Sequence, residues 1–303
     1  MLQGFANHLR AMRPKQWVKN VFVFAAPVFS QRLTDFDTML AALMAFVGFA
    51  CVSSSIYLLN DVLDYEQDKL HPKKRNRPIA AGLVDRRNAV VLAMLLAPLG
   101  LALGWHLNVY TAAVLGTYYV TNLAYSVRLK HIAIVDVFII AFGFMLRVVA
   151  GATAINAPLS AWLLVTSFFL ALFMAFGKRR GELDALGGAA AAHRANLADV
   201  TIAYLDQAMA SLTALTVMSY ALYTIDPAVI ARLGTDGLVL TVPFVLFGVL
   251  RYLHQVHLGH GGSPTTLVLT DRVLQLNGGI WLLLVVTFVY LDVRLGLVVS
   301  ALH

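Results

Sequence analysis

Charged residues are scarce in this chain of 303 residues: Asp, Glu, Lys and Arg together make up 13% of it, whereas hydrophobic residues make up 59%. Soluble globular domains carry about 25% charged residues, so the composition excludes an ordinary soluble domain. Apolar stretches of about 20 residues, the length that crosses a bilayer, recur along the chain. The sequence therefore predicts an all-α polytopic membrane protein, with residues 1–303 forming a single integral membrane domain.

Cysteine is nearly absent as well. Cys51 is the one cysteine, so an internal disulfide is excluded and we expect a small packing residue. Residues 1–13 have neither an apolar core nor a small-residue cleavage site, and we expect the first helix to act as an anchor rather than a removable signal peptide. His254, His257 and His260 are spaced three apart, but no cysteine or carboxylate stands at matching positions, so we expect no zinc site.

Lys and Arg are distributed very unequally along the chain. Hydropathy predicts nine transmembrane helices, over residues 16–31, 38–60, 88–105, 108–127, 132–154, 159–177, 205–225, 237–254 and 278–299. In this scheme 19 of the 23 Lys and Arg residues fall on one side of the membrane, three fall on the other, and Arg147 lies within it. The positive-inside rule places the richer side in the cytoplasm. The net charge of +7 then reflects topology, and we do not expect nucleic acid as a partner.

Carboxylates crowd the cytoplasmic end of the helix expected over 38–60. On a helix, the spacing of Asp61, Asp64 and Asp68 puts all three side chains on one face within about two turns. Like charges this close repel, and Asn60 adds an oxygen that suits Mg²⁺. The basic run Lys73-Lys74-Arg75-Asn76-Arg77-Pro78 follows and could clamp phosphate charge. Metal ligands and cations together predict a diphosphate site; the alternative is a solvated helix end.

These residues carry a family resemblance. Asn60-Asp61-x-x-Asp64-x-x-x-Asp68, followed by Arg75-x-Arg77-Pro78, resembles the first signature of the UbiA superfamily of intramembrane prenyltransferases. The longer strings from Asp68 to Gly82 and from Arg13 to Asn20 are similar to its decaprenyl-phosphate phosphoribosyltransferase branch, and Tyr125-Ser126-x-x-Leu129-Lys130 also fits. The resemblance implies a nine-helix UbiA-like bundle with a central cavity open to the cytoplasm.

The resemblance also implies the reaction. A 5-phosphoribosyl group would pass from 5-phosphoribosyl 1-diphosphate to a polyprenyl (decaprenyl) phosphate, releasing diphosphate and supplying lipid-linked pentose for cell-envelope polysaccharide. Mg²⁺ on Asn60, Asp61, Asp64 and Asp68 would bind the leaving group, and Lys73, Lys74, Arg75 and Arg77 would neutralise it. The acceptor is a phosphate monoester that is largely ionised at neutral pH, so we expect no essential general base. The enzyme would lie in a bacterial inner membrane with its site facing the cytoplasm.

One departure from the prenyltransferase pattern is informative. Prenyltransferases of this superfamily usually carry a second Asp-rich motif after the sixth helix, where this chain reads Lys178-Arg179-Arg180-Gly181-Glu182. Cations here, Lys178 and Arg179 among them, would favour anionic groups directly, as expected if donor and acceptor both carry phosphate. The alternative is that these cations only anchor the topology.

Other candidate residues have two interpretations each. Arg147 lies near the bilayer middle and would hold a phosphate or form a structural clamp, because an intramembrane charge is costly. Tyr125, Arg128 and Lys130 follow the fourth helix and would contact the ribose phosphate or mark the membrane boundary. Lys15 and Lys19 would meet the lipid phosphate or anchor the first helix. Asp271 and Arg272 would close the site from the other half of the chain.

Two rival functions remain at this point. A prenyltransferase acting on an aromatic acceptor would want a second carboxylate cluster, which the Lys178-Arg179-Arg180 run opposes. A lipid transporter without chemistry would tolerate neutralisation of the Asp residues. The sequence leaves open the polyprenyl chain length, the stereochemistry at C1 and whether the protein forms a homo-oligomer.

Overall fold

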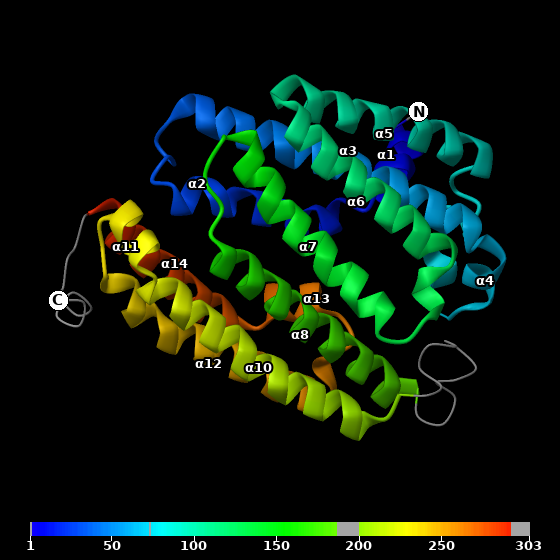
Figure 1. The fold of residues 1–303 in the computed structure, drawn as a ribbon. Helices are drawn as coiled ribbons and strands as arrows, with labels where there is room; N and C mark the ends of the chain where they lie inside the picture. Colours follow the sequence, from blue (N-terminus) through cyan, green and yellow to red (C-terminus); the bar gives the residue numbers. More distant parts are fainter. Residues whose placement is uncertain (1, 73, 187–199, 292–303) are drawn as a thin grey trace. The chain divides into compact units, whose positions relative to one another are not determined.

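The computed structural model describes residues 2–72, 74–186 and 200–291, and within these ranges it is helical with no β-strand (Figure 1). Seven helices of the described chain are long and apolar enough to cross a membrane: Phe36–Leu63, Arg86–Leu107, Val135–Ala154, Ala161–Asp184, Ile202–Ile225, Gly237–His260 and Arg272–Tyr290. The chain is therefore an integral membrane protein of all-α class. The last part of the helix expected over 278–299 lies outside the described residues.

The chain divides into two compact units. The first comprises Met1–Ala25, Asp35–Leu129 and Leu146–Ala157; the second comprises Ala26–Thr34, Lys130–Met145 and Pro158–His303. Helix α7 (Val135–Ala154) contributes its first half to the second unit and its second half to the first unit.

The first unit is built on two long neighbouring helices. Its elements are α1 (Leu2–Ala11), the 3-10 helix η1 (Pro14–Phe24), α3 (Phe36–Leu63), α4 (Tyr65–Leu70), η2 (Lys74–Asn76), α5 (Arg86–Leu107) and α6 (Val109–Val127). α3 packs along α5, and α6 packs against both (Figure 1). A Cβ on Gly100 of α5 would lie 2.7 Å from the carbonyl oxygen of Gly48 in α3. The two helices approach this closely because both positions lack a side chain.

The segment expected as a first helix over 16–31 is not one α-helix, which corrects that prediction. The chain forms the 3-10 helix η1 from Pro14 to Phe24 and then the short α2 (Ala25–Phe29). Hydropathy indicates that such a segment is apolar, but it does not distinguish the tighter 3-10 helix from an α-helix. Several β-branched and aromatic residues in η1 lower its α-helix propensity.

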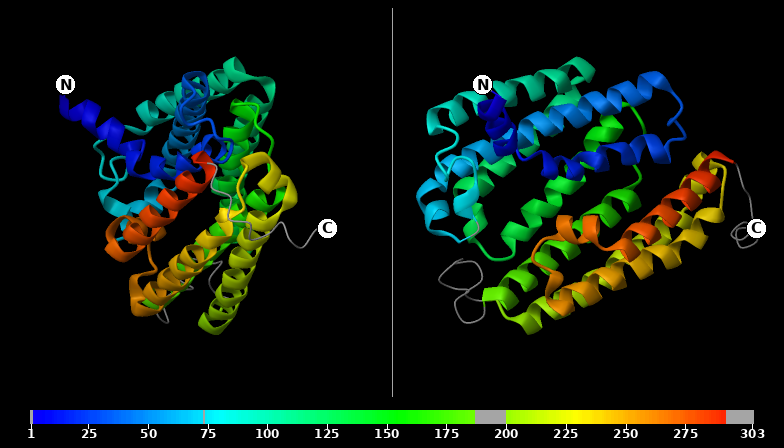
Figure 2. Two further views of the ribbon diagram at one scale, coloured as in Figure 1. Left: turned by 90° about the vertical axis from the view of Figure 1, so that its left-hand side faces the viewer. Right: turned by 180° about the vertical axis from the view of Figure 1, so that it is seen from behind.

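The second unit is a set of long helices around an aromatic and aliphatic core. Its further elements are η3 (Leu129–His131), α8 (Ala161–Leu186), α10 (Ile202–Ile225), α11 (Pro227–Leu233), η6 (Gly237–Thr241), α12 (Val242–Gln255), the π-helical turn η7 (Val256–His260), α13 (Pro264–Thr270) and α14 (Arg272–Tyr290). α8 packs along α10, α10 along α12, and α12 along α14 (Figure 2). Phe173 and Phe176 of α8, Met209 of α10 and Tyr252 of α12 meet in the core.

Helix α8 runs beyond the apolar segment expected to end at residue 177. It continues through the charged residues to Leu186. Pairs four residues apart support this extension, because Lys178 Nζ lies 3.7 Å from Glu182 Oε1 and Arg180 Nη1 lies 3.8 Å from Asp184 Oδ2. The cationic run is thus helical rather than part of a loop.

Candidate active site

The acidic residues of the first unit stand where α3 passes into α4. Asn60 and Asp61 lie in the last turn of α3, Asp64 stands between the helices with φ −89° and ψ 9°, and Asp68 lies in α4. The three Asp residues thus do not lie on one continuous helix, which is the condition under which their spacing puts them on one face. The hydrogen-bond register is nevertheless kept, because Asp64 N donates to Asn60 O at 2.9 Å and Asp68 N donates to Asp64 O at 2.8 Å. Asp61 and Asp68, two turns apart, still face the same way.

Arg77 joins two buried carboxylates. Its Nη1 lies 2.9 Å from Asp61 Oδ1 and 2.5 Å from Asp68 Oδ2. Asp61 is 2% exposed and Asp68 1% exposed. Arg13 Nη2 also donates to Asp61 Oδ1, and Lys74 Nζ lies 3.7 Å from Asp68 Oδ1. We call these five residues, Asp61, Asp68, Arg13, Lys74 and Arg77, the charged cluster.

Sequence reasoning missed Arg13 as a site residue. Arg13 has a left-handed backbone, with φ 58°, immediately before Pro14. Its guanidinium carbon lies 5.0 Å from the centre of the Tyr57 ring. Ser54 fixes the neighbouring backbone, since its Oγ donates to Met12 O at 3.1 Å. The string from Arg13 to Asn20 is a signal of family membership, but its spacing from Asp61 says nothing of their contact.

The oxygen donors of the charged cluster suit a hard divalent cation such as Mg²⁺. Asp68 Oδ1 is buried and has no hydrogen-bond partner among the described residues, so a lone pair is available there. No three carboxylate, histidine or cysteine side chains of the described chain are grouped so that they could hold an ion. Asp61 Oδ1 already accepts from both Arg13 and Arg77. The donor chemistry fits the ion, and the arginines compete for the same oxygen.

The other predicted residues of the first unit are dispersed. Asn60 Nδ2 donates to Asp64 Oδ2 at 3.1 Å. Lys19 in η1 and Tyr125 in α6 are half-buried. Three cations are exposed and form no ion pair among the described residues: Lys15, Arg75 and Arg128. Lys73 lies outside the described residues. The structure thus brings together Asp61, Asp68, Lys74 and Arg77 from the predicted set.

Arg147 of α7 is buried within the first unit, at 3% exposure. Its Nε donates to Asn20 Oδ1 at 2.8 Å and its Nη2 donates to Tyr118 Oη at 2.9 Å. The guanidinium carbon also lies 4.7 Å from the Tyr118 ring centre and 5.3 Å from that of Phe49. These contacts join η1, α3, α6 and α7, which favours the clamp interpretation.

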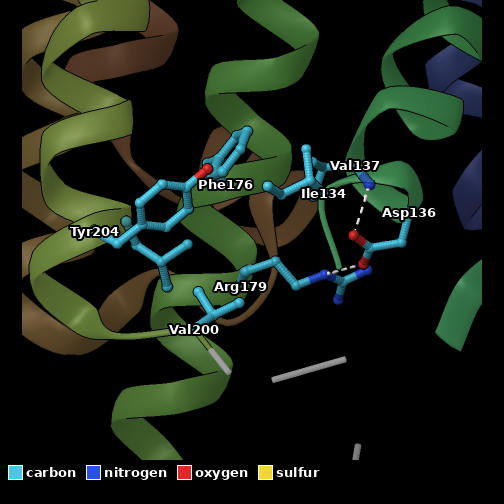
Figure 3. Close-up of a pocket in the computed structure, with 8 residues that line it drawn as sticks. Ile134, Asp136, Val137, Phe176, Arg179, Val200 and Tyr204 are labelled. Atoms are coloured by element: carbon cyan, nitrogen blue, oxygen red, sulfur yellow. Dashed lines mark hydrogen bonds and ion pairs between the residues drawn. The ribbon is translucent and has the colours of Figure 1, made fainter. Parts of the chain in front are cut away.

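In the second unit, Arg179 of α8 forms a buried ion pair with Asp136 of α7 (Figure 3). Arg179 Nε lies 2.7 Å from Asp136 Oδ2, and its Nη1 lies 2.6 Å from Glu182 Oε2. The pair borders a small pocket, which Figure 3 shows between α7, α8 and α10, lined by Ile134, Asp136, Val137, Phe176, Arg179, Val200, Tyr204 and Leu205. In place of a second carboxylate cluster, α8 thus presents cations that are already engaged by acids.

Three further ion pairs involve predicted residues of the second unit. Arg180 Nε and His257 Nε2 lie 2.9 and 3.4 Å from Asp206 Oδ1. Asp271 caps α14 by accepting from Leu274 N at 2.9 Å, and Arg251 Nη2 lies 2.9 Å from its Oδ2. The Leu274 amide and the Arg251 guanidinium hold the pKa of Asp271 below its usual 3.8. Asp271 therefore has a structural role within its own unit.

The sequence profile of the UbiA prenyltransferase family matches residues 21–271. The chain belongs to this family. Its relatives include a decaprenyl-phosphate phosphoribosyltransferase of Corynebacterium glutamicum, 38% identical over 93% of this chain and 86% of the relative. A decaprenyl-phosphate phosphoribosyltransferase of Mycobacterium tuberculosis is 38% identical over 91% of this chain and 92% of its own length.

Solved structures of the UbiA family share the fold. A UbiA homolog from Archaeoglobus fulgidus, bound to GPP and Mg²⁺, superposes with a TM-score of 0.69 at 18% sequence identity, covering 94% of this chain and 99% of that chain. Identity this low establishes the architecture alone. The sequence-based assignment to the UbiA superfamily is confirmed, whereas the nine-helix count and a cytoplasmic cavity stay predictions.

Proposed function

We propose that this chain transfers 5-phosphoribosyl from 5-phosphoribosyl 1-diphosphate to a polyprenyl phosphate, with Mg²⁺, and releases diphosphate. The observation that carries the proposal is the charged cluster, in which two buried carboxylates and three cations meet at one helix end. The 38% identity to enzymes named decaprenyl-phosphate phosphoribosyltransferase, over nine-tenths of the chain, supports this substrate pair.

The predicted residues would have separate roles in binding the metal and the leaving diphosphate. Asn60, Asp61, Asp64 and Asp68 would hold Mg²⁺, which when bound supplies positive charge to the leaving diphosphate. Lys74 and Arg77 would donate to diphosphate oxygens as the bond from C1 to oxygen breaks, and Lys73 and Arg75 would add positive charge nearby. The acceptor phosphate is already ionised at neutral pH and needs orientation rather than a general base.

The remaining predicted substrate contacts belong to this proposal. Lys15 and Lys19 would meet the acceptor phosphate, and Tyr125, Arg128 and Lys130 the ribose phosphate. Arg147 would hold a phosphate, although its guanidinium also donates to Asn20 and Tyr118. Lys178 and Arg179 would raise the positive potential of the second unit, although Arg179 is committed to Asp136 and Glu182. The protein would have nine transmembrane helices in a bacterial inner membrane, with its site in a central cavity open to the cytoplasm.

A purified-protein assay with radiolabelled donor and polyprenyl phosphate tests the proposal. Asp61→Asn and Asp68→Asn should each lower kcat/KM by about 100-fold or more, since each removes charge where the leaving group is stabilised. Glu66→Gln is the matched control, because Glu66 lies in the same helix α4 but is exposed. Product that forms equally in EDTA, or Asp variants as active as Glu66→Gln, would overturn the proposal.

One rival has a specific observation in its favour. The superposed Archaeoglobus fulgidus homolog was solved with GPP, a prenyl diphosphate. The same preparation incubated with a prenyl diphosphate and an aromatic acceptor would release diphosphate if this chain were a prenyltransferase. We expect release only with the phosphoribosyl donor. A lipid transporter would release none with either donor.

A further inference from the structure

A single carboxylate oxygen has two guanidinium partners in the charged cluster. Asp61 Oδ1 accepts from Arg13 Nη2 and from Arg77 Nη1, the latter at 2.9 Å. Two charge-assisted hydrogen bonds occupy both lone-pair directions of a carboxylate oxygen, so none is left for a metal. A metal ion that uses Asp61 Oδ1 must therefore displace at least one arginine.

The charges of the cluster make that displacement costly when no anion is present. The carboxylates of Asp61 and Asp68 carry two negative charges, against three positive charges on Arg13, Lys74 and Arg77. A divalent ion added to this group raises its excess positive charge further, in a region where both carboxylates are buried. A diphosphate group brings roughly three negative charges at neutral pH and compensates the added ion.

Arg13 is placed so that it can leave Asp61 for another anion. Its side chain is 26% exposed, whereas that of Asp61 is 2% exposed. The Tyr57 ring supports the guanidinium from one side without neutralising it. Arg77 is 25% exposed as well, but it also binds Asp68 Oδ2. Arg13 pairs with Asp61 alone among the described residues, so it is the arginine that can turn to another anion.

We propose that Arg13 is a positioning residue that makes metal binding at Asp61 conditional on a diphosphate-bearing ligand. Without such a ligand, Arg13 holds the Asp61 oxygen. With it, Arg13 passes to a phosphate oxygen and Asp61 becomes available to the metal. This inference rests on the proposed diphosphate site and adds a binding order: the metal ion binds together with the diphosphate-bearing ligand and not before it.

Mn²⁺ serves as the probe, with the free ion counted by its electron paramagnetic resonance signal in titrations of the detergent-solubilised full chain. Arg13→Gln should bind Mn²⁺ alone about tenfold more tightly than the wild type, because the competing cation is gone. Arg13→Met, which keeps an unbranched stem beside Tyr57, should do the same and serves if Arg13→Gln is poorly folded. Arg10→Gln is the control and should behave as wild type, since Arg10 is exposed and donates to the Asn76 carbonyl at 3.3 Å rather than to a carboxylate of the charged cluster.

Titrations with added inorganic diphosphate measure the coupling. A protein-free series measures the Mn²⁺ that diphosphate binds by itself, and this amount is subtracted. In the wild type, diphosphate should tighten Mn²⁺ binding about tenfold or more, and in both Arg13 variants this factor should fall towards one. Unchanged or weaker Mn²⁺ binding by folded Arg13 variants would overturn the inference. These readings need neither acceptor nor turnover, so they separate failure of the coupling from failure of the phosphoribosyl transfer assay.

Discussion

Gly181 lies in α8 beside the cations Lys178 and Arg179, and the loop after η7 passes directly over it. A Cβ at Gly181 would stand 2.5 Å from the carbonyl carbon of Gly261 and 2.6 Å from the amide nitrogen of Gly262. Both neighbours are backbone atoms, so no change of rotamer relieves the overlap. Gly181→Ala must push α8 away from this loop or distort the loop itself.

The cost follows from the size of the overlap. Inserting a methyl group into packed structure destabilises by about 1–3 kcal/mol, and a backbone-to-methyl overlap belongs at the upper end of that range. Gly279→Ala in α14 is the matched control within the same unit, because a Cβ added there would have nothing within 4 Å of it. Alanine is a better helix former than glycine by up to about 1 kcal/mol, so this control should be neutral or stabilising.

Thermal unfolding of the purified variants in one detergent, followed by circular dichroism at one scan rate, measures the difference. At roughly 2–4 °C per kcal/mol for a chain of this size, Gly181→Ala should unfold roughly 5–10 °C below the wild type. Gly279→Ala should unfold at or slightly above it. A Gly181→Ala variant as stable as the wild type would refute the backbone contact between α8 and the loop.

Three further predictions concern buried or capped charges. Asp136→Asn should destabilise by up to about 3 kcal/mol because it removes the buried carboxylate that pairs with Arg179 Nε and leaves the ion pair with the more exposed Glu182. The double variant with Arg179→Gln should lose less than the sum of the single variants in thermal unfolding. Tyr118→Phe removes the acceptor of Arg147 Nη2 and should cost about 1–3 kcal/mol, measured by denaturant titration; no loss would contradict the clamp. Because the pKa of Asp271 is lowered in the folded state, its stabilising contribution is complete above pH 3.8 and is lost as the pH falls through the lowered pKa. Below about pH 4 the wild type should therefore lose stability more steeply with falling pH than Asp271→Asn. Equal dependence of stability on pH in the two proteins would count against this.

The apolar helices were largely predictable from the sequence because the bilayer imposes length and composition together. The segments expected over 88–105 and 108–127 became α5 and α6 with ends shifted by two residues or fewer. The charged end of α8 was not predicted, because the apolar segment that hydropathy detects ends at the first cations. The helix continues beyond that point with ion pairs between residues four apart on its surface. The 3-10 winding of η1 escaped it because hydropathy is insensitive to how tightly an apolar segment is wound.

The candidate site was predictable where it depends on local spacing. Asp61 and Asp68 share a face because they stand two helical turns apart, and Arg77 follows within the same loop. The contact of Arg13 with Asp61 spans 48 residues and depends on how η1 packs against α3, which local periodicity does not specify. The same holds for Arg179, whose partner Asp136 lies on another helix.

The interruption of the helix at Asp64 gives the two bridged carboxylates unequal freedom. Asp61 lies in the last turn of α3, a helix of 28 residues that packs against its neighbours. Asp68 lies in α4, a helix of six residues that leads into extended backbone at His71. A change of the backbone dihedrals at Asp64 would therefore alter the distance between the two carboxylates while the long helix α3 keeps its packing.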